Sequence, residues 1–128
     1  MLLAAPSSFA QDNALPQGED GPAIVEDTPP PYEPQLLRLT ELMGSLHFLR
    51  QLCGGIDAPE WRSRMEDFLA SENPSPLRRA RFITQFNRGY QAFDTTYTSC
   101  TRAAEEATRL FVAEGKKLSE GIVNRYGN

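Results

Sequence analysis

The chain has 128 residues, 40% of them hydrophobic, which is enough for one small core and too little for two ordinary domains. Residues 11–34 carry six acidic groups and no basic ones, so removing them from the formal net charge of −4 leaves the rest of the chain at about +2. This balance excludes a nucleic-acid-binding protein. No segment approaches the ~18 apolar residues of a membrane-spanning helix, so we expect a soluble mature chain without a transmembrane segment.

The first ten residues, MLLAAPSSFA, are typical of the end of an export signal. Ser8 and Ala10 stand at the −3 and −1 positions of a cleavage site that would follow Ala10. A complete signal also has a positively charged region and a longer apolar segment, which residues 1–10 lack. They therefore indicate the remnant of an export signal whose true start lies upstream. The signal predicts that the protein is periplasmic. An ordinary unstructured N-terminus is the alternative.

Residues 11–34 form the second predicted segment, a disordered leader. Besides its acidic groups this stretch contains six prolines. A segment of this composition cannot bury enough apolar surface to offset the entropy of ordering it. We expect the folded domain to occupy residues 35–128.

Helical periodicity begins at Gln35. Apolar residues at spacings of three and four place one face of the first predicted helix on Leu39, Leu42, Leu46, Leu49 and Cys53. Leu37 and Phe48 lie on roughly the opposite side, so this helix is expected to be covered from two directions. Gly54 and Gly55 end it.

The second helix is expected to begin after Asp57. The Asp57 carboxylate is a good N-cap, and Glu60 follows at the capping-box position. The apolar face of this helix consists of Trp61, Met65, Phe68 and Leu69. Asn73 and Pro74 mark its end.

The third helix is expected to begin at Ser75–Pro76, where the missing N–H of proline costs little. Its apolar positions are Ile83, Phe86, Tyr90, Phe93, Tyr97 and Cys100. The stretch TTYTSCT predicts a break at residues 98–101 and a fourth helix from Arg102 to Tyr126, although one unbroken helix remains an alternative. The packing residues of the fourth helix are expected to be Leu110, Phe111, Leu118, Ile122 and Val123. The fold class is therefore all-α, a small four-helix bundle.

Cys53 and Cys100 each close an apolar seam, and two cysteines in an exported chain usually pair. We therefore predict a disulfide between them. A Cys53–His47 nucleophile is disfavoured, because six residues separate the two side chains by about 240° around a helix. One histidine and two cysteines also do not supply a tetrahedral metal site, so we expect no metal, no cofactor and no catalytic residue.

The run RRARFITQFNRGY places two cations in the first turn of the third helix, where they oppose the helix dipole. Glu66, Asp67 or Glu72 is expected to offset Arg78 and Arg79, with an acidic partner or an anionic envelope polymer as the alternative. Gly89 costs helical stability and is expected to permit the close approach of another helix.

A polar patch is the candidate partner surface. Its residues are His47, Trp61, Arg62, Asn87 and Arg88. Capping or salt-bridge roles are the alternative for each of them. His47 can also hydrogen-bond as a half-buried flank residue.

Four stretches together, LHFLRQLCGGIDAPEWRSRM, FNRGYQAF, YTSC and LSEGIVNRY, resemble a family of short alphaproteobacterial exported proteins of unknown function. The likeness covers about residues 36–126. It implies export and a helical fold, and it brings no catalytic assignment.

The leading hypothesis is a non-enzymatic periplasmic protein that binds an envelope protein or polymer. One alternative is an enzyme acting on an envelope polymer, with carboxylates from Glu41, Asp57, Glu60 or Asp94. Another is a binder of a small apolar ligand that uses Phe82, Phe86, Tyr90, Phe93 and Tyr97. The residue pattern contains no pair of carboxylates placed across a cleft.

Overall fold

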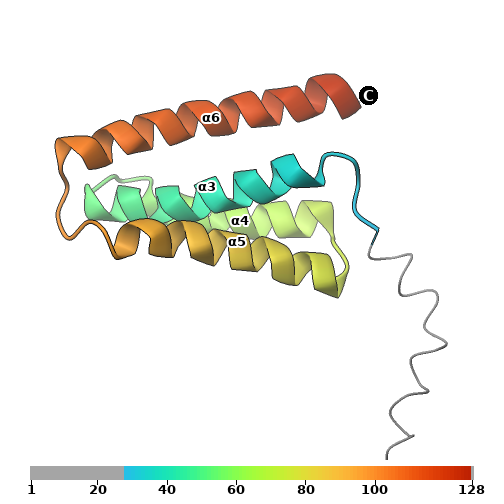
Figure 1. Cartoon of the computed structure of the whole chain (residues 1–128), viewed down its shortest axis with the longest axis horizontal. Helices are drawn as coiled ribbons and strands as arrows, with labels where there is room; N and C mark the ends of the chain where they lie inside the picture. Colours follow the sequence, from blue (N-terminus) through green and yellow to red (C-terminus); the bar gives the residue numbers. More distant parts are fainter. Residues whose placement is uncertain (1–27, 128) are drawn as a thin grey trace, which may run out of the picture.

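The computed structural model describes residues 28–127, which form four α-helices and no strand. The helices are α3 (Glu33–Leu52), α4 (Ala58–Glu72), α5 (Pro76–Asp94) and α6 (Arg102–Tyr126). They run roughly along one long axis and are joined by short connections (Figure 1). The all-α, four-helix prediction is confirmed. The expected export-signal remnant and most of the expected leader lie outside the described residues.

Local capping and turn residues explain three of the helix boundaries. Ser75 Oγ accepts a hydrogen bond from the backbone N–H of Arg78, and Thr101 Oγ1 accepts one from Ala104 (3.3 and 3.1 Å). The chain leaves the helical conformation between Asp94 and Arg102, so the predicted break is confirmed, but it begins before residue 98, and Tyr97 and Cys100 lie beyond the end of α5. Gly54 follows α3 with φ of +72°, a conformation that costs glycine little. The first helix begins at Glu33, two residues before the expected start.

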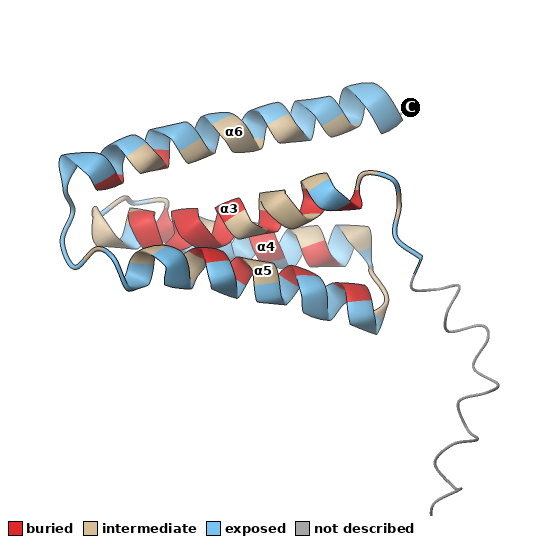
Figure 2. Ribbon diagram, viewed as in Figure 1, coloured by how far each residue is buried: buried red, intermediate tan, exposed pale blue. Residues whose placement is uncertain are grey.

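Helix α3 lies at the centre of the molecule and packs against each of the other three helices. Eight consecutive residues, 42–49, are buried, so two turns of this helix are covered around most of their circumference (Figure 2). A helix covered all around needs apolar or small residues on every face, which explains why Leu37 and Phe48 lie opposite the main seam. The expectation that α3 is covered from more than one direction is confirmed.

Two glycines bring α3 and α5 into backbone contact. A Cβ atom on Gly44 would overlap the carbonyl oxygen of Phe86, and one on Gly89 would overlap that of Glu41. Ser45 Oγ donates a hydrogen bond to the Gly89 carbonyl (3.1 Å) across the same crossing. The role predicted for Gly89 is confirmed, and Gly44 is its counterpart on α3.

The core consists of two clusters along the axis. One contains buried Leu36, Met43, Met65, Leu69, Phe82 and Phe86, and the other contains Phe48, Leu49 and Ala104. Tyr90 and Phe93 of α5 and Tyr97 just after it pack against the second cluster, so these aromatic residues form part of the core. Leu110 and Val123 were expected to pack but are 51% and 63% exposed, because only one face of α6 lies on α3.

A disulfide joins Cys53, just after α3, to Cys100, just before α6. Its Cα atoms are 4.9 Å apart, within the range that an unstrained bridge spans. The predicted pairing is confirmed. It fastens the start of α6 to the end of α3, and Ala104 and Thr108, the buried residues of α6, lie directly after it.

Candidate functional site

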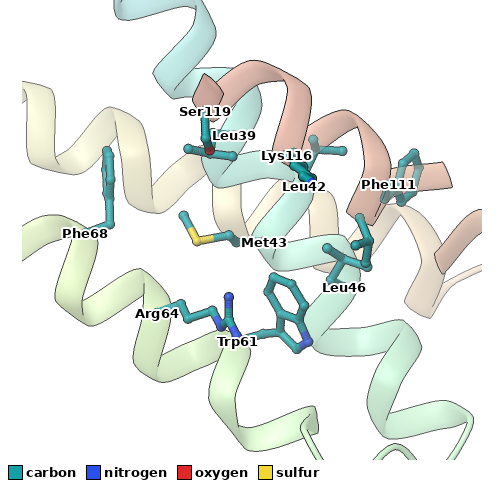
Figure 3. Close-up of a pocket in the computed structure, with 12 residues that line it drawn as sticks. Leu39, Leu42, Met43, Leu46, Trp61, Arg64, Phe68, Phe111, Lys116 and Ser119 are labelled. Atoms are coloured by element: carbon teal, nitrogen blue, oxygen red, sulfur yellow. The ribbon is translucent and has the colours of Figure 1, made fainter. Parts of the chain in front are cut away.

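An apolar groove of about 380 Å³ runs between α4 and α6, with α3 as its floor (Figure 3). We call it the α4–α6 groove. The floor consists of Leu39, Leu42, Met43 and Leu46. Trp61, Arg64 and Phe68 of α4 form one wall, and Phe111, Val112, Gly115, Lys116 and Ser119 of α6 form the other. The groove exists because α4 and α6 each pack on α3 and barely on one another.

The indole ring of Trp61 is held in place at this wall by its neighbours. Its Nε1 donates to Asp57 Oδ2 (3.3 Å), and the Arg64 guanidinium lies 4.7 Å from the ring centroid. Arg50 Nε donates to the other oxygen of Asp57 (2.8 Å). The hydrogen bond from Arg50 lowers the pKa of Asp57 below its ordinary value.

The side-chain role expected of Asp57 is wrong. Asp57 does occupy the N-cap position of α4, but its carboxylate makes no hydrogen bond to the backbone of that helix. It is engaged instead by Arg50 and Trp61, which come from helices on either side of the connection. Glu60 forms an exposed ion pair with Arg64 (3.4 Å) rather than a capping box.

The charges around the α4–α6 groove are positive. Arg64 and Lys116 come from opposite walls, and within residues 28–127 none of the groove-lining residues is acidic. Lys116 takes part in none of the ion pairs found in this described part of the chain. Sequence reasoning missed this flank of α6, because Val112, Lys116 and Ser119 lie beside the helix face expected to pack. The signal that could have found it is their spacing of four and three along α6.

The structure separates the residues expected to form one partner surface. Arg62 and Asn87 share a smaller groove of about 220 Å³ between α4 and α5. Trp61 lines the α4–α6 groove instead. His47 is buried, and its Nδ1 donates to the Ala58 carbonyl (3.3 Å), while Arg88 is exposed. The five residues therefore do not form one continuous patch.

Next to the disulfide lies a polar cleft of about 490 Å³. It is lined by Arg50, Cys53, Gly55, Asp57, Glu105, Thr108, Arg109 and Val112. Its two carboxylates, on Asp57 and Glu105, are accompanied by two arginines. The other carboxylates considered for acid–base chemistry lie apart from it: Glu41 pairs with Arg38 (3.1 Å), and Asp94 is exposed.

The cation at the start of α5 is neutralised within the chain. Arg78 donates to Glu33 (2.7 Å) and Glu72 (3.0 Å), and the side chains of Arg78 and Glu33 are each only 8% exposed. These hydrogen bonds, that of Glu33 foremost, raise the pKa of Arg78. Glu72 was among the expected partners. Glu33 was placed in the leader and is instead the first residue of α3.

Among the described helices, none is both long enough and apolar enough to cross a membrane. Nor do residues 28–127 bring together three or more histidine, cysteine or carboxylate side chains in a way that could hold a metal ion.

Comparison with known protein families shows which family the chain belongs to. A family described as protein of unknown function, DUF2385, matches residues 31–126. The chain belongs to the DUF2385 family. The match begins just before α3 and ends at the last residue of α6, so the DUF2385 unit and the four-helix unit coincide. No curated protein and no solved structure gives a significant match.

Proposed function

We propose that this DUF2385 protein is a non-enzymatic, exported protein of the cell envelope that holds a partner protein in its α4–α6 groove. The observation that carries the proposal is the groove itself. It has an apolar floor, aromatic walls and two cations at its sides, which is the composition of a recognition site. The apolar surface that the groove presents to solvent comes from half-buried Leu39, Trp61 and Phe111 and from exposed Val112, and a gathered apolar surface of this kind is typical of an interaction site.

The disulfide supports the exported location. Disulfides persist in the periplasm and are rare in reducing compartments. Here the bridge fastens α6, one wall of the groove, to the rest of the fold. The expected cleavage site after Ala10 points the same way.

The ion pairs support a non-enzymatic role. A general acid needs a pKa raised toward neutrality, whereas Arg50 lowers the pKa of Asp57. The cations beside Asp57 in the polar cleft thus oppose acid–base chemistry. Glu41 and Glu60 each form a partly or fully exposed ion pair on their own helix.

Photo-crosslinking from inside the groove tests the proposal. A photo-reactive amino acid replaces Val112, which lines the groove and is 44% exposed, in the protein expressed in its native host. The control position is Ala92, an exposed residue of α5. We expect one protein adduct from Val112, none from Ala92, and binding of the same partner when both proteins are purified.

A matched pair of variants makes the test specific. Ser119→Phe places a bulky side chain at the groove wall, and Ser63→Phe places the same side chain on an exposed position of α4 that does not line the groove. The adduct should be lost in the first variant and kept in the second. The same set of adducts from Val112 and Ala92 would contradict the proposal.

A further inference from the structure

The α4–α6 groove has the length of two helical turns. Its floor extends from Leu39 to Leu46, and its α4 wall extends from Trp61 to Phe68. Each stretch contains eight residues, and its seven steps of the α-helical rise cover about 10 Å. A groove of this length between two helices accepts the side chains at positions i, i+3 or i+4, and i+7 of another helix.

The two cations lie on opposite sides of the groove rather than together at one end. Arg64 projects from the α4 wall and Lys116 from the α6 wall, with Met43 on the floor between them (Figure 3). An acyl chain with one anionic head group would be matched by cations at one end of the groove. A helix that carries carboxylates on both sides of an apolar stripe is matched by cations on both walls.

Both cations are available for a new partner. The interaction of Arg64 with Glu60 is an exposed ion pair at 3.4 Å, of a kind that contributes little and exchanges readily. The indole ring beneath Arg64 keeps the guanidinium at the groove without consuming its hydrogen-bonding capacity. Lys116 takes part in no ion pair with any residue of the described range 28–127.

From this geometry we infer that the occupant of the α4–α6 groove is an amphipathic helix of a partner protein, with acidic residues on both flanks of a two-turn apolar stripe. The inference rests on the proposed function and specifies the class of partner. Apolar contact with the more exposed lining residues, Leu39, Trp61 and Val112, supplies most of the binding free energy. Arg64 and Lys116 set the position of the helix and select its charge.

The only tryptophan of the chain, Trp61, lines the groove, so its fluorescence reports occupancy directly. The probe is a synthetic helical peptide with leucines at i, i+4 and i+7 and glutamates on both flanks. Its controls are the same peptide with lysine flanks and a scrambled peptide that keeps the composition but loses the stripe. We expect the Trp61 emission to change saturably with the acidic peptide and to stay unchanged with both controls.

Charge reversal in the protein tests the roles of the cations. Lys116→Glu should weaken binding of the acidic peptide by roughly fivefold, the scale of one exposed charge pair, and should strengthen binding of the lysine-flanked peptide. Lys117→Glu is the matched control, since Lys117 is exposed, carries the same charge and does not line the groove. Equal effects of the two variants would overturn the inference.

Other occupants give different results. Saturable binding of dodecanoate without binding of the acidic peptide would identify an acyl-chain site and overturn the inference. Equal binding of the scrambled peptide would show that charge alone is recognised and would overturn it too. A change in Trp61 emission on neutralising Glu19, Asp20, Glu26 and Asp27, with no response to the peptide, would make the chain's own N-terminal segment the occupant.

The proposed function and the inferred class of partner can be rejected independently of one another. A specific adduct from Val112 with no peptide binding would leave a partner in the groove but reject an acidic helix as its class. Peptide binding without any adduct from the native host would retain the recognition chemistry and reject the proposed function.

Discussion

Helix α3 meets α5 and α6 in opposite ways. At the α5 contact, Gly44 and Gly89 let the two backbones touch, and Ser45 spans the crossing with a hydrogen bond. At the α6 contact only Ala104 and Thr108 of the outer helix are buried. That contact is completed by partly buried Ala107 and Phe111, the disulfide, the Arg38–Glu114 ion pair and the contact between the tilted rings of Tyr32 and Tyr126.

The α3–α5 contact requires a fixed distance and angle between the two helices. The α3–α6 contact requires only that α6 stays attached to α3. Close backbone packing leaves no room to adjust, so the α3–α5 contact defines the fold. A helix held by one covalent bond and a few side-chain contacts can shift without unfolding the core. The α4–α6 groove is bounded by this second kind of helix, which fits a surface that adapts to a partner.

The largest effect is expected at the glycine crossing. The double variant Gly44→Ala, Gly89→Ala places two methyl groups on backbone carbonyl oxygens, so α3 and α5 must separate. We expect the free energy of unfolding to fall by about 5 kcal/mol, which is enough to unfold a marginally stable domain. Urea denaturation followed by circular dichroism measures it.

Gly121→Ala is the control for the glycine substitutions. Nothing lies within 4 Å of the added Cβ at this position of α6, so alanine should stabilise the protein by about 0.5–1 kcal/mol. A loss of stability at Gly121 as large as at the crossing would show that helix propensity, not helix approach, explains the glycines.

Removing the disulfide is expected to have the next largest effect, and a more local one. In the chain-entropy account, a bridge with a sequence separation of 47 contributes about 4 kcal/mol, so Cys53→Ala, Cys100→Ala should lose about that amount. Amide hydrogen exchange should accelerate in α6 before it does in α3 and α5. Wild-type protein treated with a reductant should match the variant, and uniform acceleration across all helices would contradict the comparison.

The buried ion pair at the start of α5 ranks third. Arg78→Met leaves the Glu33 carboxylate buried without its partner, which should cost about 3 kcal/mol in the free energy of unfolding. Arg79→Met is the matched control, because Arg79 is exposed, and it should change stability by less than about 0.5 kcal/mol. Thermal unfolding measures the melting temperatures of both variants, and that of Arg78→Met should be the lower. Equal melting temperatures would refute the role of Arg78.

The smallest effect is a pH dependence at the α6 contact. The hydrogen bond from Arg38 lowers the pKa of Glu114 below its ordinary value of 4.5. The pair therefore contributes its full stability above about pH 4.5 and loses it as the pH falls through the lowered pKa. Both side chains are nearly 40% exposed, so Glu114→Gln should cost only about 0.5 kcal/mol at pH 7.

Denaturation at several pH values measures that difference. The stabilities of wild type and Glu114→Gln should converge as the pH falls below 4.5. Glu120→Gln changes an exposed carboxylate on the same helix that forms no ion pair within the described residues, and it should leave the profile unchanged. A gap that widens toward acidic pH would contradict the assignment.

The fold was largely predictable from sequence because its signals are local. Ser75–Pro76, Thr101 and Gly54 are capping and turn residues that act within a few positions, and they marked the helix boundaries correctly. The disulfide followed from two seams that each end in a cysteine. The expected function stays a prediction, since a helix pattern describes burial rather than recognition.

The remainder depends on distances that a sequence does not contain. Asp57 has the sequence context of a cap, but Arg50 and Trp61 compete for its carboxylate once α3 and α4 are side by side. Glu33 was assigned to the acidic leader because nothing nearby in the sequence indicates its partner 45 residues away. The groove could not be predicted, since it depends on α4 and α6 leaving a space between them.

The contact between Tyr32 and Tyr126 brings the start and the end of the four-helix unit close together. The two ring centroids are 5.0 Å apart, and the connection between α3 and α4 at the other end of the molecule carries Ile56, which is 98% exposed (Figure 1). A chain joined from Tyr126 to Tyr32 by a short linker and opened at Ile56 would keep all four helices and the bridge between Cys53 and Cys100. In such a permuted protein the central helix would be synthesised last, after the three helices that surround it.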